Sequence, residues 1–103
     1  MIVVKACDSG ISIDGHAGYD EKGKDIVCAA VSVLSQTLIK SLEELTADRI
    51  LCEVFPGHIH IYYKNLSEQG RVLVDSFFIG IGDIADSYGD EYVQIVQDNA
   101  DGH

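Results

Sequence analysis

Positive charge is scarce in this sequence. Seven of the 103 residues are lysine or arginine, against seventeen aspartates and glutamates, so the formal net charge is −10. Seven cations are too few for the broad basic patch that dominates nucleic-acid binding, and we expect no direct nucleic-acid partner. The acidic excess suits a basic protein partner, although solubility is the commoner use of net charge, and composition does not decide between them.

Cysteines and long apolar runs are also few. The cysteines, Cys7, Cys28 and Cys52, are odd in number and have no C-x-x-C spacing. This argues against a disulfide framework and a structural zinc site. The apolar start of the chain is interrupted by Lys5 and lacks the positive region of a signal peptide. No stretch approaches the roughly 20 apolar residues of a membrane span, so we expect a cytoplasmic protein without a membrane partner.

The length and apolar content are those of one globular domain. Hydrophobic residues make up 47% and charged residues 23% of the chain, a balance typical of folded soluble proteins. A chain of 103 residues lies within the usual size of a single domain. We therefore predict one domain over residues 1–103.

The spacing of apolar residues predicts the order strand, strand, helix, strand, strand, helix, strand. Alternation and β-branched residues predict strands over 1–7, 11–14, 49–55, 58–64 and 91–96. Three- and four-residue spacing predicts helices from the N-cap Asp25 through Leu45 and over 71–89, with a polar tail over 97–103. Two helices cannot cover both faces of five strands. We expect an α+β fold, a mainly antiparallel five-stranded sheet with both helices on one face, and exposed edges that favour a homodimer.

A segment rich in glycine and charge joins the second strand to the first helix. Residues 15–24 contain three glycines, two acidic side chains and two basic side chains. Glycine permits unusual backbone angles, and the charges favour water. We expect a mobile, exposed loop.

The residues at the two ends of this loop have the chemistry of a nucleophilic site. Cys28 would be the third residue of the helix that Asp25 caps, where the helix dipole and free N–H groups favour the thiolate. The same N–H groups could form an oxyanion hole. His16 could fold across the loop to pair with Cys28. The alternative, open at this point, is that Cys28 is a packed core thiol and His16 an ordinary hydrogen-bonding residue.

The pattern Gly15-His16-Ala17, a glycine-bearing loop, and Asp25-Ile26-Val27-Cys28-Ala29-Ala30 with Ser32 resembles the ribosomal-processing cysteine protease family Prp. The resemblance covers nearly the whole chain in length and element order. It implies a catalytic Cys28–His16 dyad supported by Asp25 and Ser32, an α+β homodimer, and no metal or organic cofactor. It further implies an endopeptidase that removes a short N-terminal extension from large-subunit ribosomal protein twenty-seven, which would be its substrate and partner. With such a substrate, the loop over residues 17–24 could close over an extended peptide; the alternative is an ordinary solvated loop.

The roles of the two supporting residues stay open. Asp25 could cap the helix, orient His16, or both. Ser32 lies one turn after Cys28 and could support the site or bond back to the Cys28 carbonyl. Two other functions also remain: a non-catalytic acidic module that binds basic ribosomal proteins, and a thiol-redox sensor, which lacks a resolving cysteine nearby in sequence.

The other histidines and cysteines are predicted to have structural roles. His58 and His60 share one face of a predicted strand, a spacing that can bind metal. No cysteine or carboxylate at a suitable sequence spacing joins them, so we predict that they face solvent or a dimer partner without a metal. Cys7 and Cys52 are predicted to be small core residues.

Overall fold

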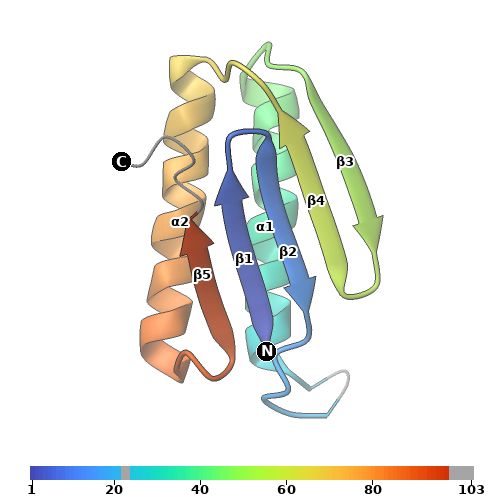
Figure 1. Ribbon diagram of the computed structural model, residues 1–103, viewed down its shortest axis with the longest axis vertical. Coiled ribbons are helices and arrows are strands. Elements are labelled where there is room, and N and C mark those ends of the chain that lie inside the picture. Colours follow the sequence, from blue (N-terminus) through green and yellow to red (C-terminus); the bar gives the residue numbers. More distant parts are fainter. Residues whose placement is uncertain (22–23, 98–103) are drawn as a thin grey trace.

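The structure, a computed structural model, describes residues 1–21 and 24–97. Its elements are β1 (Ile2–Cys7), β2 (Gly10–Gly15), α1 (Ile26–Leu45), β3 (Ile50–Phe55), β4 (His58–Tyr63), α2 (Glu68–Tyr88) and β5 (Val93–Gln97). This is the predicted order (Figure 1).

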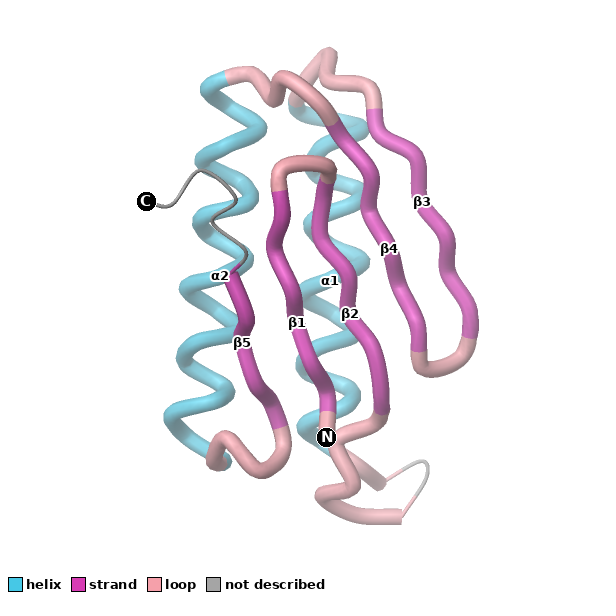
Figure 2. The backbone as a smooth tube through the Cα atoms, in the orientation of Figure 1, coloured by secondary structure: helices cyan, strands magenta, loops and turns pink. Residues whose placement is uncertain are grey.

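The five strands form one mixed sheet in the order β3-β4-β2-β1-β5. The pairs β1–β2, β2–β4 and β3–β4 are antiparallel, and β1–β5 is parallel. Both helices lie on the same face of the sheet, and β3 forms one edge (Figure 2). The predicted α+β fold is therefore confirmed, with a single parallel pair in a mainly antiparallel sheet.

The core lies between the sheet and the two helices. Strand residues on one face alternate into it, as the period of two requires, and the helices contribute residues three and four apart. Full burial of such a side chain contributes about 1.5–3 kcal/mol. The main contributors are Ile2, Val4, Ile11, Ile13, Ile61, Val93, Val27, Val31, Leu38, Leu42, Phe77 and Ile81.

Helix α1 is long and apolar enough to resemble a membrane span, although the sequence analysis expected no such stretch. By length and composition it could cross a membrane, with a mean hydropathy of 1.4 over its best window. In the fold, 28% of this window is buried, and the buried side chains lie against the core. They are Val27, Val31, Ser35, Leu38 and Leu42.

Three structural predictions were inaccurate. Helix α2 begins at Glu68 rather than at residue 71, because Ser67 caps it and accepts a 3.0 Å hydrogen bond from the Gly70 N–H. Strand β5 runs over Val93–Gln97 rather than 91–96, in register with β1. Cys52 is exposed instead of buried, because it lies on the edge strand β3. Most of the predicted polar tail lies outside the described residues.

Candidate active site

Cys28 is the third residue of α1, as the Asp25 cap predicts. Asp25 Oδ1 accepts hydrogen bonds from the N–H groups of Val27 and Cys28, both at 3.0 Å, and Oδ2 accepts one from Tyr19 at 3.0 Å. Partial burial by itself raises the pKa of Asp25, but the bonds from Cys28 and Tyr19 outweigh it and hold that pKa below its usual value. Asp25 thus joins the start of α1 to the preceding loop.

The Cys28 thiol is half-buried and contacts the backbone two residues beyond the end of β2. The Ala17 N–H donates to Cys28 Sγ at 3.2 Å, and Ala17 itself is buried. A backbone donor at this distance can stabilise negative charge on sulfur. The N–H groups of Val27 and Cys28 already donate to Asp25, so the oxyanion hole expected from them is not free in this structure.

His16 and Cys28 line one cavity of about 420 Å³. Within the described residues, however, no hydrogen bond joins the His16 ring to Sγ. The ring lies against Gly57: a Cβ built on Gly57 would be 2.8 Å from His16 Nε2. The cavity therefore holds both predicted residues, with the imidazole resting on the β3–β4 turn.

The β3–β4 turn is the part of this cavity that sequence reasoning missed. Phe55, Pro56 and Gly57 line it together with His16 and Cys28. The Gly15 N–H donates to the Gly57 carbonyl at 2.8 Å, which ties the turn to the end of β2. Pro56-Gly57 identifies a turn in the sequence, but nothing local places that turn beside Cys28.

Gly15 itself has a steric reason to be glycine. Its φ is +103°, and a Cβ there would lie 2.2 Å from the carbonyl oxygen of Met1. Only glycine adopts this conformation at this distance without displacing the neighbouring backbone. Gly15 thereby sets the path of the chain into His16.

Ser32 lies one turn beyond Cys28 on α1. It is exposed and lines the same cavity. In the described part of the chain, the hydrogen bond from Ser32 back to the Cys28 carbonyl does not occur. Ser32 can therefore contact a molecule in the cavity, whereas the nearby Ser35 is buried and donates to the Val31 carbonyl at 2.7 Å.

The loop between β2 and α1 is anchored by one aromatic side chain. Tyr19 packs edge-on against Tyr88 and Tyr92, with ring centroids 5.3 Å and 5.1 Å apart. Residues 22–23 lie outside the described residues, so loop closure over a peptide stays a prediction. The described loop residues Gly18, Asp20 and Glu21 are exposed.

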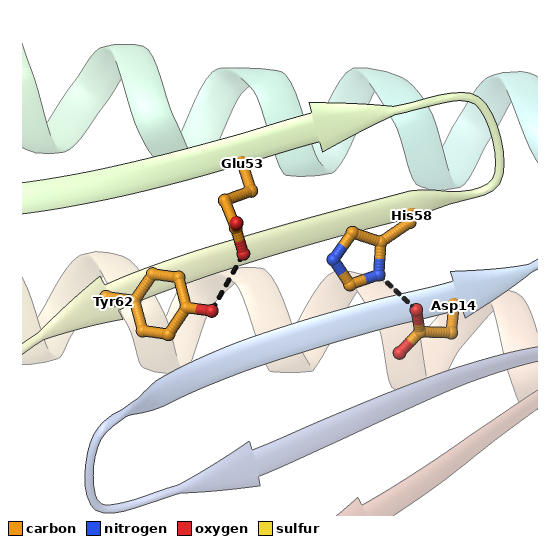
Figure 3. A network of polar contacts seen from close by, with 4 residues as sticks. All are labelled: Asp14, Glu53, His58 and Tyr62. Atoms are coloured by element: carbon orange, nitrogen blue, oxygen red, sulfur yellow. Dashed lines mark hydrogen bonds and ion pairs between the residues drawn. The ribbon is translucent and has the colours of Figure 1, made fainter.

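The sequence spacing suggested that no carboxylate lies near His58 and His60, but the fold brings two carboxylates beside them. Asp14 on β2 lies opposite His58, and Glu53 on β3 lies opposite His60. Figure 3 shows His58 Nδ1 bonded to Asp14, while Glu53 approaches from the neighbouring strand and binds Tyr62. The sequence did not reveal these neighbours, because strand pairing brings together residues far apart in the chain.

Comparison with known proteins gives a consistent family assignment. The family model described as "Cysteine protease Prp" matches residues 1–94. Over 83 residues, covering 78% of each protein, the chain is 26% identical to the ribosomal processing cysteine protease Prp of Staphylococcus aureus.

Solved structures support the same fold. The S. aureus protease Prp in complex with a covalently linked product peptide has a TM-score of 0.87 at 24% identity, over 95% of this chain and 100% of that one. Its complex with a substrate peptide gives 0.73 at 20% identity, over 94% and 97%. At these identities the likeness shows the fold alone.

A further structure, SMU.848 from Streptococcus mutans, is 30% identical with a TM-score of 0.64, over 94% of this chain and 91% of that one. The family model spans the first six strands and helices and the first two residues of β5. This chain therefore belongs to the cysteine protease Prp family.

Proposed function

We propose that this protein is a cysteine endopeptidase that removes the N-terminal extension of large-subunit ribosomal protein twenty-seven, with Cys28 as nucleophile and His16 as acid and base. The observation that supports it is the placement of both residues in one cavity at the start of α1, in a chain of a cysteine protease family. Ribosomal processing is the activity named for the S. aureus relative.

The first half of the reaction forms a thioester. His16 takes the proton of the Cys28 thiol, Sγ attacks the scissile carbonyl carbon, and the carbonyl oxygen becomes the oxyanion of a tetrahedral intermediate. The C–N bond then breaks, and His16 gives its proton to the leaving amine. The Ala17 N–H donates to Sγ at 3.2 Å, so this backbone donor lies beside the sulfur that forms the new bond.

The second half hydrolyses that thioester. His16 takes a proton from water, the hydroxide attacks the acyl carbon, and the thiolate leaves. Because the ring rests on Gly57 in the free protein, we infer that it turns toward Sγ when a peptide occupies the cavity. Catalytic hydrogen bonds often form only in the complex with substrate.

The supporting residues take roles that follow from their contacts. Asp25 fixes the start of α1 and the loop through Tyr19, so its role is to position Cys28. Ser32 faces the cavity and contacts the bound peptide. The acidic surface attracts a basic ribosomal substrate in the cytoplasm.

The decisive experiment measures the mass of the extended ribosomal protein before and after incubation with the full chain. We expect cleavage by the wild type and loss of cleavage in Cys28→Ala and His16→Ala. The matched control is Cys52→Ala, which removes an exposed thiol on β3 and should cleave as the wild type does. Cleavage by Cys28→Ala would overturn the proposal.

The same experiment distinguishes the protease from a binding module, and the cysteine positions bear on the redox sensor. Tight binding of the extended protein by the wild type without any change in mass would identify a binding module. A redox sensor would need a partner thiol for Cys28. Cys7 lies at the turn end of the β1–β2 hairpin, whereas Gly15 lies at the opposite end. All three cysteines are free thiols.

A further inference from the structure

The open face of the sheet carries a group of metal-ligating side chains that the proposed protease reaction does not use. Glu53, His58 and His60 each offer one ligand atom, and these atoms lie within 4.8 Å of one another. Strands β3 and β4 supply them. Glu53 and His58 lie on the face of the sheet that the helices do not cover (Figure 3), and His60, which pairs with Glu53, shares that face. We propose that this group binds a divalent transition-metal ion, with zinc as the best match.

His60 contributes an unsatisfied nitrogen. Its Nε2 is buried and has no hydrogen-bond partner among the described residues. The ring is fixed by stacking on Tyr62, with centroids 3.8 Å apart and planes 7° from parallel. A buried polar atom without a partner costs free energy, and a metal ion would give this nitrogen a ligand bond.

His58 is already oriented as metal-bound histidines usually are. Asp14 bonds to its Nδ1, which leaves Nε2 for a metal (Figure 3). A carboxylate on the other ring nitrogen fixes the tautomer and the ring orientation of metal ligands. Asp14 is therefore the positioning residue of the site.

Glu53 completes the set with a carboxylate oxygen. Its Oε1 now accepts a 2.7 Å hydrogen bond from the Tyr62 hydroxyl and is exposed enough to rotate. Two imidazoles and one carboxylate, with water as a fourth ligand, are a donor set that zinc uses in proteins. In a tetrahedral zinc site the ligand atoms lie about 3.4 Å apart. Side-chain rotations that move these ligand atoms by about 1 Å would bring them to that spacing.

The position of the site gives the metal a structural consequence. It would clamp β3 to β4 and, through Asp14, to β2. The same hairpin ends in the Pro56-Gly57 turn that supports His16, and His58 also lines the Cys28 cavity. Metal binding on the open face would therefore rigidify one wall of the candidate active site.

The test uses untagged full-length protein carrying Cys28→Ala, because the Cys28–His16 pair could itself bind zinc. Zinc is titrated in competition with a chromophoric chelator. We expect one ion per chain, a loss of affinity of about 100-fold or more in Glu53→Gln and His60→Ala, and a loss of about 10-fold in Asp14→Asn. The matched control, Glu44→Gln, removes an exposed charge on α1 and should bind as the parent does.

Several results would overturn the zinc site. They are no binding by the Cys28→Ala parent, unchanged affinity in folded Glu53→Gln, or an equal loss in Glu44→Gln. Cobalt substitution adds an independent check: a thiolate-to-metal absorption band would assign the ion to a cysteine and refute the site. If His60→Ala does not fold by circular dichroism, the exposed Glu53→Gln variant decides the question.

Discussion

At the scale of single residues, the nucleophile and its partner are held in different ways. Cys28 is fixed by the start of α1 and by the Ala17 N–H. His16 is exposed, and its ring is supported by Gly57. The position of the proton carrier therefore depends on a turn in another hairpin, and substitutions in that turn should affect catalysis without touching Cys28.

Gly57→Ala should lower kcat for peptide cleavage by about 100-fold, because misplacement of a catalytic group by about 1 Å can have an effect of this size. The added Cβ would approach His16 Nε2 to 2.8 Å and displace the ring. The measurement is kcat on an extended substrate peptide, with folding checked by thermal unfolding.

Gly18→Ala is the matched control for backbone strain. Gly18 has φ +69°, close to the +73° of Gly57, but a Cβ there would meet nothing within 4 Å. Both variants should lose similar stability, while Gly18→Ala keeps much more activity. Equal losses of kcat would show that strain, not displacement of His16, is responsible.

Asp25 should act through its position rather than through proton transfer. Asp25→Ala removes the acceptor for Val27, Cys28 and Tyr19, and should lower the free energy of unfolding by about 0.5–2 kcal/mol, the usual range for a helix cap. Asp25→Asn keeps one side-chain oxygen and should recover most of that loss in chemical denaturation. If Asp25→Asn is folded yet as inactive as Cys28→Ala, the carboxylate takes part in the chemistry.

At the scale of elements, the start of α2 depends on one polar cluster. Asp48 accepts hydrogen bonds from the Ser67 N–H at 3.0 Å and the Ser67 hydroxyl at 2.8 Å. The Ser67 hydroxyl bond is the main cause that holds the pKa of Asp48 below its usual value. The cluster joins the segment after α1 to the cap of α2.

Ser67→Ala should destabilise the protein by about 1 kcal/mol through loss of this cap. Because the folded pKa of Asp48 is lowered, its contribution is present above about pH 4 and disappears as the pH falls through the folded value. Denaturation at pH 7 and pH 3 should therefore show a smaller effect of Ser67→Ala at the lower pH. An effect that is equal at both values contradicts the role of Asp48.

The sequence predicted those features that depend on local pattern. The Asp25 cap, the position of Cys28 in α1 and the inward face of β4 follow from spacing and side-chain chemistry. Strand order does not, because pairing energies between distant segments leave no local trace. For that reason the Gly57 support of His16 and the carboxylates beside His58 and His60 could not be anticipated.

The predicted start of α2 was wrong for another reason. Ser67 is a good cap by residue type, but the apolar pattern begins only after Arg71, so periodicity placed the helix too late. Cys52 was placed in the core because alternation shows which face a residue lies on, not whether that face is covered. Coverage depends on the helices, which leave the edge strand β3 exposed.

At the scale of the whole molecule, the edge strand β3 suits self-association, and we propose that the protein is a homodimer through this edge. Leu51 is 74% exposed on β3. Leu51→Lys should convert a particle of twice 11.2 kDa into one of 11.2 kDa by analytical ultracentrifugation. Ile79→Lys on α2, where Ile79 is 75% exposed, is the matched control and should remain dimeric. A wild type that sediments as a monomer contradicts the proposal.

The net charge of −10 should appear in the kinetics. Attraction between an acidic enzyme and a basic substrate accelerates association, and salt screens it. We expect kcat/KM on the extended ribosomal protein to fall by about tenfold when the salt concentration is raised from low to high, while kcat stays nearly constant. A short, uncharged substrate peptide is the control and should show little salt dependence.

The parallel pairing of β1 with β5 has a consequence for the time course of folding. Residues 2–6 pair with residues 93–97, so this contact joins the two ends of the described chain and can form only late. The β1–β2 hairpin can form early, but closing so long a loop is entropically slow. During synthesis β1 therefore keeps an open edge until β5 emerges, and this interval is when the nascent chain is most prone to pair with the wrong strand.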